Sequence, residues 1–290
     1  MGRADPDDLL RLSDAAALLG VGDTTLKRWT EENRIPCERT LGGHRRFRRS
    51  AVLAWKAAHS GASTGAPAPG QDAPAPVAAS TDARTWLDAE SDPAEPTRVH
   101  AHLVTLRSRC RDWAETGDRL CSGLLSEIGS RWMSGTLTCA QEHAMTRSIE
   151  IGISRISHQF PIAPNAPCVV LACPAGERHT LGLTLVEAVL RERGVQVHFL
   201  GPDVPSRDLV DAVRRIGPIA VGLSASSCPR PSIELEEAAS AAAAVCAEKR
   251  ARLLLGGGAA WPPTKGARRF LTLTELARAI DELVPKSFAS

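Results

Sequence analysis

The chain has 290 residues, 43% of them hydrophobic, and a formal net charge of +2, so it is long enough for two or three domains with cores of their own. No stretch approaches the roughly 18 consecutive apolar residues of a membrane span, and the first residues lack the apolar core of a signal peptide. These features exclude a helical membrane protein, and we expect a cytoplasmic location. The eight cysteines form no Cys-x-x-Cys pair, which favours reduced thiols in the core.

Residues 1–59 have the pattern of a helix-turn-helix unit. A short apolar-faced helix is followed by the turn Gly20-Val21-Gly22 and by a second helix that carries Leu26 and Trp29 on its buried side. Residues 35–47 then predict a β-hairpin with Gly-Gly at its tip, and a third helix follows. The sequence therefore predicts a winged helix-turn-helix domain at this end of the chain.

Basic residues gather in this unit. Between residues 27 and 56 there are nine Lys or Arg against three acidic residues, a charge balance suited to phosphate groups. A solvated basic surface is the alternative, but the predicted fold favours DNA binding. The segment Leu41-Gly42-Gly43-His44-Arg45-Arg46-Phe47 resembles the wing of MerR-type regulators, which implies that the second helix enters the major groove of double-stranded operator DNA while the wing reaches phosphates or the minor groove. The predicted DNA-binding residues are Thr24, Thr25, Lys27, Arg28, Arg39, His44, Arg45 and Arg46.

Two further segments precede the last domain. Residues 60–80 are rich in Ala, Pro, Gly and Ser and predict a flexible linker, in place of the coiled coil through which MerR proteins often dimerise. In residues 81–163 apolar side chains recur every three or four positions, which predicts a four-helix bundle. Thr138 and Gln141 form a capping box for its last helix. Nine residues separate Trp132 from Glu142-His143, and by itself this spacing fits a core tryptophan and a solvated pair.

Residues 164–290 have the alternating strands and helices of a Rossmann-like or flavodoxin-like domain. The apolar run from Cys168 to Cys173 predicts a buried parallel strand, and Glu177, His179 and Gly182 follow it at the edge of the sheet where such domains bind ligands. Further strands are predicted at 196–200, 219–224, 253–255 and 270–272. The segment Trp261-Pro262-Pro263 interrupts the chain where another helix is expected.

Three motifs at the ends of these strands are similar to those of cobalamin-binding domains. Glu177-x-His179-x-x-Gly182 resembles Asp-x-His-x-x-Gly, and the other two are Ser224-Ala225-Ser226 and Gly256-Gly257; in isolation, Ser and Gly after strands are also ordinary turn residues. A metal-bound imidazole usually donates its second N–H to a carboxylate, a role that Glu177 can fill. The resemblance implies that His179 is the lower cobalt ligand. It further implies that the nucleotide tail of the cofactor lies against Gly182, Ser224, Ser226, Gly256 and Gly257.

With a MerR-type head and a cobalamin motif beside it, the Trp-x9-Glu-His spacing resembles the light-responsive, adenosylcobalamin-dependent repressors of the CarH/LitR group. The resemblance implies that Trp132 packs against the adenosyl group, that Glu142 hydrogen-bonds its ribose or adenine, and that His143 lies nearby. Met133 departs from the group, in which a histidine at this place takes the upper cobalt position after illumination. A thioether binds cobalt(III) poorly, so Met133 argues against a stable bis-histidine photoproduct in this protein.

The sequence therefore predicts a multidomain α/β protein: a winged helix-turn-helix at 1–59, a linker at 60–80, a four-helix bundle at 81–163 and a Rossmann-like cobalamin domain at 164–290. We expect no enzymatic activity. The predicted function is that of a repressor, a homo-oligomer (dimer or tetramer) that binds its operator in the dark and releases it on Co–C photolysis. Two alternatives remain open at this point, a B12-sensing regulator without a light response and a corrinoid methyl-carrier protein of a methyltransferase.

Overall fold

The computed structural model describes residues 9–19, 26–27, 29–30, 35–39, 45–60, 83, 86–88, 94–226 and 232–284. The chain forms two compact units. The first unit is Met1–Trp86 with Gly123–His143, and the second unit is Leu87–Ser122 with Ala144–Ser290. No helix in the described residues has the length and apolar character that crossing a bilayer requires.

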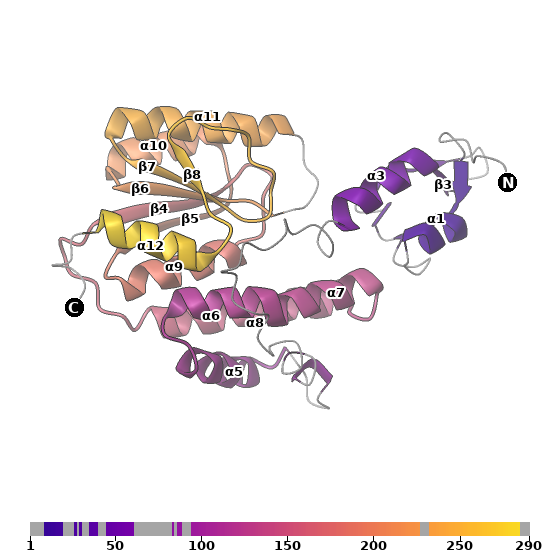
Figure 1. Cartoon of the computed structure of the whole chain (residues 1–290), viewed down its shortest axis with the longest axis horizontal. Coiled ribbons are helices and arrows are strands. Elements are labelled where there is room, and N and C mark those ends of the chain that lie inside the picture. The colour runs from indigo at the N-terminus through magenta and orange to yellow at the C-terminus, as the bar shows by residue number, and fades with distance from the viewer. Residues whose placement is uncertain are drawn as a thin grey trace, which may run out of the picture. The chain divides into compact units, whose positions relative to one another are not determined.

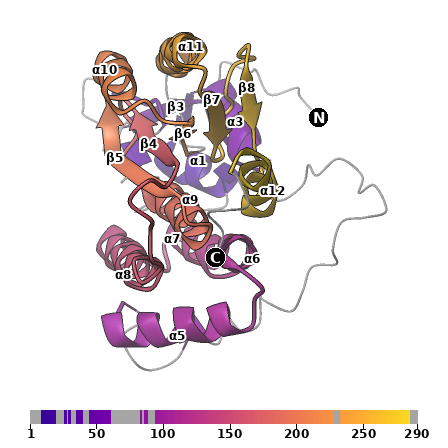
Figure 2. The same cartoon turned by 90° about the vertical axis from the view of Figure 1, so that its left-hand side faces the viewer.

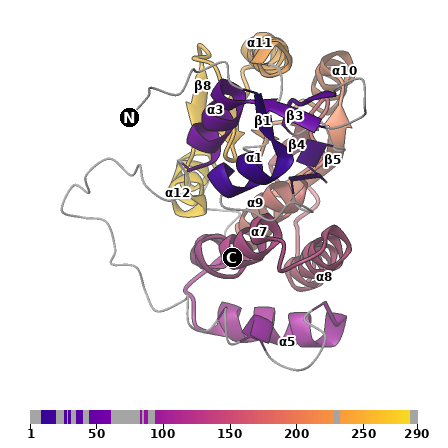
Figure 3. The same ribbon diagram turned by 90° about the vertical axis from the view of Figure 1, so that its right-hand side faces the viewer.

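The N-terminal part of the first unit has a small antiparallel sheet and helices packed on it (Figure 3). Strand β2 (Glu38–Arg39) pairs with β3 (Arg45–Arg48), which confirms the predicted hairpin, and β1 (Leu9–Arg11) adds a strand on the other side of β3 that the sequence did not predict. Helices α1 (Leu12–Leu19) and α3 (Arg49–Ser60) contact each other. Buried Phe47 belongs to their core, where the ring centroids of Trp29 and Trp55 lie 4.6 Å apart.

The four main helices of residues 94–157 are α5 (Pro96–Ser108), α6 (Trp113–Leu120), α7 (Ser126–Ser134) and α8 (Cys139–Ser157), and a π-helical turn η1 (Cys121–Leu125) joins α6 to α7. The predicted capping box is confirmed: the Thr138 N–H donates to Gln141 Oε1 at 3.0 Å, and the Gln141 N–H donates to Thr138 Oγ1 at 3.2 Å. Within the second unit α8 packs closely on α5. A Cβ at Gly152 would lie 2.5 Å from the side chain of Leu103.

A five-stranded parallel sheet forms the centre of the second unit, in the order β5-β4-β6-β7-β8. Figures 1 and 2 show α10 and α11 on one face of this sheet and α9 and α12 on the other, which confirms the predicted Rossmann-like class. The strands are β4 (Cys168–Pro174), β5 (Gln196–Val204), β6 (Ala220–Ser224), β7 (Arg252–Gly256) and β8 (Ala267–Arg269). The helices are α9 (Leu181–Glu192), α10 (Ser206–Ile216), α11 (Ser232–Lys249) and α12 (Leu273–Leu283).

The segment between β7 and α12 differs from the prediction. The last strand lies at Ala267–Arg269 and not at 270–272, because Phe270 turns into the core and Thr272 already caps α12 by accepting a hydrogen bond from the Glu275 N–H at 3.1 Å. Trp261 occupies the place of the missing helix. Its buried indole packs in the core on the α11 side of the sheet and donates to the Gly256 carbonyl at 2.8 Å.

Candidate functional site

The loop from β4 to α9 carries His179 and is fixed to the end of β5. Gly176 adopts a positive φ of 78°, and its N–H donates to the Asp203 carboxylate at 2.7 Å. The Asp203 N–H in turn donates to the Glu177 carbonyl at 2.8 Å. Asp203 itself lies in the left-handed region at φ 55°. This reciprocal pair of hydrogen bonds holds the loop at the carboxyl edge of the sheet.

The Glu177 side chain is completely buried and accepts hydrogen bonds from two residues. Its Oε1 lies 2.6 Å from His179 Nδ1 and 2.9 Å from the His179 N–H, and its Oε2 accepts from the Ser226 N–H at 2.6 Å and hydroxyl at 2.8 Å. Burial raises the pKa of Glu177, but the hydrogen bonds from His179 and Ser226 outweigh it and lower the pKa to about 2. The group is therefore ionised at neutral pH and can only accept.

This charge state decides which nitrogen of His179 is the donor. Because an ionised carboxylate offers no proton, His179 Nδ1 must donate its N–H to Glu177, and the lone pair of the neutral ring is on Nε2. The His179 side chain is 64% exposed although Glu177 is buried. The arrangement presents an oriented imidazole that can bind a metal from outside the sheet.

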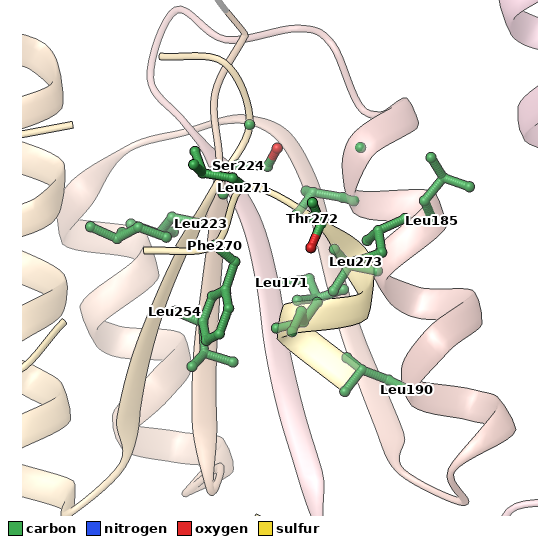
Figure 4. A pocket seen from close by; sticks show the side chains of 18 of the residues that line it. Leu171, Leu185, Leu190, Leu223, Ser224, Leu254, Phe270, Leu271, Thr272 and Leu273 are labelled. Atoms are coloured by element: carbon green, nitrogen blue, oxygen red, sulfur yellow. The ribbon is translucent and has the colours of Figure 1, made fainter. Parts of the chain in front are cut away.

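An apolar cavity of about 180 Å³, partly open to solvent, lies between the sheet and helices α9 and α12. In the close-up, Ser224 stands at one end and Leu190 towards the other, with Leu171, Leu254 and Leu273 between them (Figure 4). The predicted residues Gly182, Ser224, Gly256 and Gly257 all line it. Ser226 is not among the lining residues, since its side chain is bonded to Glu177 and lies 3.2 Å from His179 Nδ1.

Two of the predicted glycines lie in close contact with the end of β6, and Gly257 is required there by its backbone neighbours. A Cβ at Gly182 would lie 3.0 Å from Ser224 Oγ, at the edge of the cavity. Gly257 has a φ of 82°, and a Cβ there would lie 2.1 Å from the Ala225 carbonyl oxygen. The Gly256-Gly257 pair therefore packs directly on the turn after β6.

The residues predicted for the upper face of a cofactor belong to the first unit, whereas His179 belongs to the second. Trp132 lies in α7 and is half-buried, and its indole N–H donates to Cys139 Sγ at 3.4 Å. Glu142 and His143 lie in the first turn of α8, and His143 Nδ1 is 2.5 Å from Glu142 Oε2. The side chain of Met133 lies outside the described residues.

Of the predicted DNA-binding residues, Lys27 is exposed on the second helix, and Arg45 and Arg46 lie in β3 of the wing. Arg39 lies in β2, opposite Arg45 in the pairing of the two strands. The other four predicted residues, Thr24, Thr25, Arg28 and His44, lie outside the described part of the chain.

The sequence reasoning did not find Asp203, nor Asp118 and Cys121 of α6 and η1, which also line the cavity. Asp203 lies at the end of β5, the strand that pairs with β4, so only knowledge of the strand order could have placed it beside the His179 loop. Asp118 and Cys121 come from a segment predicted as a separate bundle, and no local pattern connects them to the sheet.

Comparison with known proteins gives two family matches. Residues 9–60 match a helix-turn-helix domain, and residues 167–275 match a B12 binding domain. The chain is 40% identical over 107 residues to the HTH-type transcriptional repressor CarH of Myxococcus xanthus, and 33% identical over 104 residues to CarA of the same organism. The first match covers 37% of this chain and the second 36%, and the chain spans 36% of the length of each repressor.

A solved structure supports the fold. The monomethylamine corrinoid protein of Methanosarcina barkeri superimposes with a TM-score of 0.50 at 14% identity, over 71% of this chain and 98% of that one. At this identity the similarity concerns the fold alone. The protein thus combines a helix-turn-helix domain with a B12 binding domain on a corrinoid-protein-like scaffold.

Proposed function

We propose that this protein, a relative of the CarH and CarA repressors with a helix-turn-helix domain and a B12 binding domain, is a cobalamin-dependent transcriptional repressor. The observation that carries the proposal is the oriented imidazole of His179, with its proton fixed on Nδ1 by buried Glu177, in a unit that also holds an apolar cavity. The repressor activity would be exerted on operator DNA in the cytoplasm.

The residues present fit a cobalamin. Cobalt binds an imidazole through the nitrogen that carries no proton, and in His179 that nitrogen is Nε2 because Nδ1 donates to Glu177. The apolar lining of the cavity suits the base of a nucleotide tail, and at its edge Gly182 leaves room beside Ser224, whose Oγ would lie 3.0 Å from a Cβ there. His179 is thus the proposed lower ligand, oriented by Glu177 and Ser226. The proposed tail-binding residues are Gly182, Ser224, Gly256 and Gly257.

We propose adenosylcobalamin as the form that is sensed. When bound, it supplies a cobalt–carbon bond that light can break. Trp132 offers a flat apolar wall for the adenosyl group, and the Glu142 carboxylate can accept hydrogen bonds from ribose hydroxyls. The short contact from His143 to Glu142 supports a role for His143 in orienting that carboxylate.

Regulation would work through assembly. A homo-oligomer, dimer or tetramer, carries several basic heads, and heads that bind one operator together gain affinity through their effective concentration. Loss of the adenosyl group can change this assembly only through contacts that differ between the two states, and Trp132 and Glu142 are the proposed contacts. Lys27, Arg39, Arg45 and Arg46 are the proposed DNA contacts among the described residues, with Thr24, Thr25, Arg28 and His44 beside them in the sequence.

The test compares gel shifts of the protein on DNA from its own promoter, with adenosylcobalamin in darkness and after green light. We expect retention in darkness, release after illumination, and loss of the bound-cofactor spectrum in His179→Ala. The matched variant His198→Ala, on the edge strand β5, should keep the spectrum. A His179→Ala protein with an unchanged cofactor spectrum would refute the assignment of the lower ligand.

Two alternatives give other results in the same experiment. A B12 sensor without a light response, which Met133 favours because a thioether binds cobalt(III) less well than imidazole, would retain DNA equally before and after illumination. A methyl-carrier protein would accept a methyl group from a substrate and bind DNA no better with cofactor than without it. The basic helix-turn-helix head favours the repressor over the methyl carrier.

A further inference from the structure

The residue after His179 begins helix α9, but its side chain does not cap that helix. Thr180 is the N-cap residue, and its side chain makes no capping hydrogen bond because its backbone is already helical, at φ −93° and ψ −12°. The Thr180 carbonyl accepts the Thr184 N–H at 2.9 Å and the Thr184 hydroxyl at 3.2 Å. Helix α9 therefore fixes the backbone of Thr180 and leaves its hydroxyl to donate elsewhere.

The hydroxyl of Thr180 donates to Glu150 of helix α8. The distance to Glu150 Oε1 is 2.6 Å, and the two residues lie 30 positions apart in the chain. The Glu150 side chain is 13% exposed, and its other oxygen lies 3.5 Å from the largely exposed guanidinium of Arg147. A hydrogen bond to a charged acceptor is strong, whereas a long ion pair to an exposed arginine contributes little. The contact with Thr180 is thus the stronger of the two.

A second polar contact joins the same two helices further from the His179 loop. His158, just beyond the end of α8, has its Nε2 3.1 Å from Glu187 Oε1, which also accepts from Arg191 at 3.0 Å. Both contacts line the same groove between α8 and α9. The contact at His158 therefore attaches α8 to α9 without involving a residue next to His179, and it offers a matched comparison for the contact at Thr180.

The Glu177 carboxylate orients His179 from the sheet, but its bonds end at the imidazole and the N–H of that residue. We propose that Glu150 is a positioning residue for the lower ligand. Through Thr180 it holds the backbone that follows His179 against α8, and so keeps His179 Nε2 where it can bind cobalt. The proposal rests on the proposed function and deepens it. Because the first turn of α8 carries the pair proposed for the upper face, one helix would serve both faces of the cofactor.

The test compares three variants of the full chain: Thr180→Val removes the hydroxyl, Thr180→Ser restores it, and Glu150→Ala removes the acceptor. The controls are Thr184→Val, whose hydroxyl bonds within α9, and His158→Ala, which removes the second contact between the helices. Absorbance titration measures the affinity for cobalamin. Electron paramagnetic resonance of bound cob(II)alamin, in protein that contains histidine labelled with the heavy nitrogen isotope, distinguishes a histidine on cobalt from the cofactor's own base.

We expect the dissociation constant for cobalamin to rise about tenfold in Thr180→Val and Glu150→Ala, since a hydrogen bond to a charged group is worth about that factor. The splitting from labelled histidine should weaken in both variants. Thr180→Ser and the two controls should match the wild type in both measurements. A variant that is only less stable would bind less cofactor but show the full histidine splitting in what it binds, so the splitting tests the positioning role.

Wild-type affinity and splitting in Thr180→Val would overturn the proposal. An equal loss in His158→Ala would do the same, and so would a Thr180→Ser protein that behaves like the valine variant. If Glu150→Ala does not fold, the Thr180 variants and the controls decide the question by themselves. A wild-type protein that binds no cobalamin refutes the proposed function instead, and one that binds it without a histidine splitting refutes the lower ligand.

Discussion

Glu177 is the residue on which the orientation of His179 depends, and its buried charge makes the cofactor-free protein sensitive to acid. Its pKa is about 2 in the folded chain, against an ordinary value of 4.5. Because the folded value is the lower one, this carboxylate contributes stability that is complete above about pH 4.5 and is lost as the pH falls towards 2. The full contribution corresponds to about 3 kcal/mol.

We therefore expect Glu177→Gln to have a lower free energy of unfolding than the wild type at pH 7. As the pH falls from about 4.5 to 2, the two free energies of unfolding should become equal. The change in the difference between the two free energies of unfolding as the pH falls below about 4.5 reports the ionisation of Glu177 together with its hydrogen bonds to His179 and Ser226. Urea unfolding followed by circular dichroism at several pH values gives this difference. A constant difference across the range would contradict the assignment of a low pKa to Glu177.

Single residues of the site were predictable where their partners are near in sequence. Glu177 and His179 lie two residues apart, and the carboxylate-to-imidazole bond follows from chemistry alone. Ser226, which supplies two hydrogen bonds to Glu177, lies 49 residues further on. The sequence predicts a place for Ser226 beside the tail but no bond to Glu177, because its distance from this carboxylate depends on β6 lying next to β4.

At the level of elements, the turn after β6 and the glycines after β7 pack against each other. Alanine at Gly257 would combine an unfavourable positive φ with a Cβ 2.1 Å from a backbone oxygen, which cannot move aside as a side chain can. Gly266 is the matched control, since its φ of 80° is almost the same and no atom lies within 4 Å of its Cβ position.

We expect Gly266→Ala to lose about 1 kcal/mol of stability from the backbone conformation alone, and Gly257→Ala to lose several times more. Gly257→Ala should also weaken cobalamin binding, because the turn that carries Ser224 must shift. Thermal unfolding and absorbance titration measure the two effects. Similar losses of stability in the two variants would mean that the turn after β6 shifts to accommodate the Gly257→Ala side chain, which would contradict the prediction.

A hydrogen bond connects helix α8 to the His179 loop within the second unit. The Thr180 hydroxyl donates to Glu150 Oε1 at 2.6 Å, and the Glu150 side chain is only 13% exposed. Thr184, one turn further along α9, bonds to its own helix at the Thr180 carbonyl and provides the control.

A double-mutant cycle of Thr180→Val and Glu150→Ala should give a coupling free energy of about 1 kcal/mol or more, since the acceptor is charged. The cycle of Thr184→Val with Glu150→Ala should give none. Urea unfolding of the six proteins supplies both values. Equal coupling in the two cycles would show that Glu150 acts on α9 in general and not through Thr180.

The elements themselves were predicted best where an apolar period is long, as in the buried strands β4 and β6. Strand β1 was missed because three residues give too short a pattern, and its pairing with β3 depends on a partner more than 30 residues away. The last strand was placed three residues too late, since Phe270 looks like a strand residue but packs as the first residue beyond β8.

For the whole molecule, the formal charge of +2 conceals an uneven distribution. The basic residues between 27 and 56 exceed the acidic ones threefold, whereas the chain as a whole has 35 basic and 33 acidic residues. Charge therefore favours DNA at the segment 27–56. The rest of the chain has more acidic than basic residues, which opposes non-specific DNA binding to that part. The net charge of the whole chain does not reveal this basic segment, whereas the count over residues 27–56 predicts it.

This distribution gives a prediction that does not require knowledge of the operator. On random-sequence duplex DNA, the logarithm of the binding constant falls linearly with the logarithm of salt concentration, with a slope near 0.9 for each neutralised phosphate. If Arg45 and Arg46 of the wing each contact a phosphate, the double variant Arg45→Ala with Arg46→Ala should reduce that slope by about 2. Arg214→Ala removes the same kind of charge in the second unit, where Arg214 is paired with Glu248, and should leave the slope unchanged. Fluorescence anisotropy across a salt series measures all three proteins, and an equal slope in the wing variant and the wild type would exclude the wing from phosphate binding.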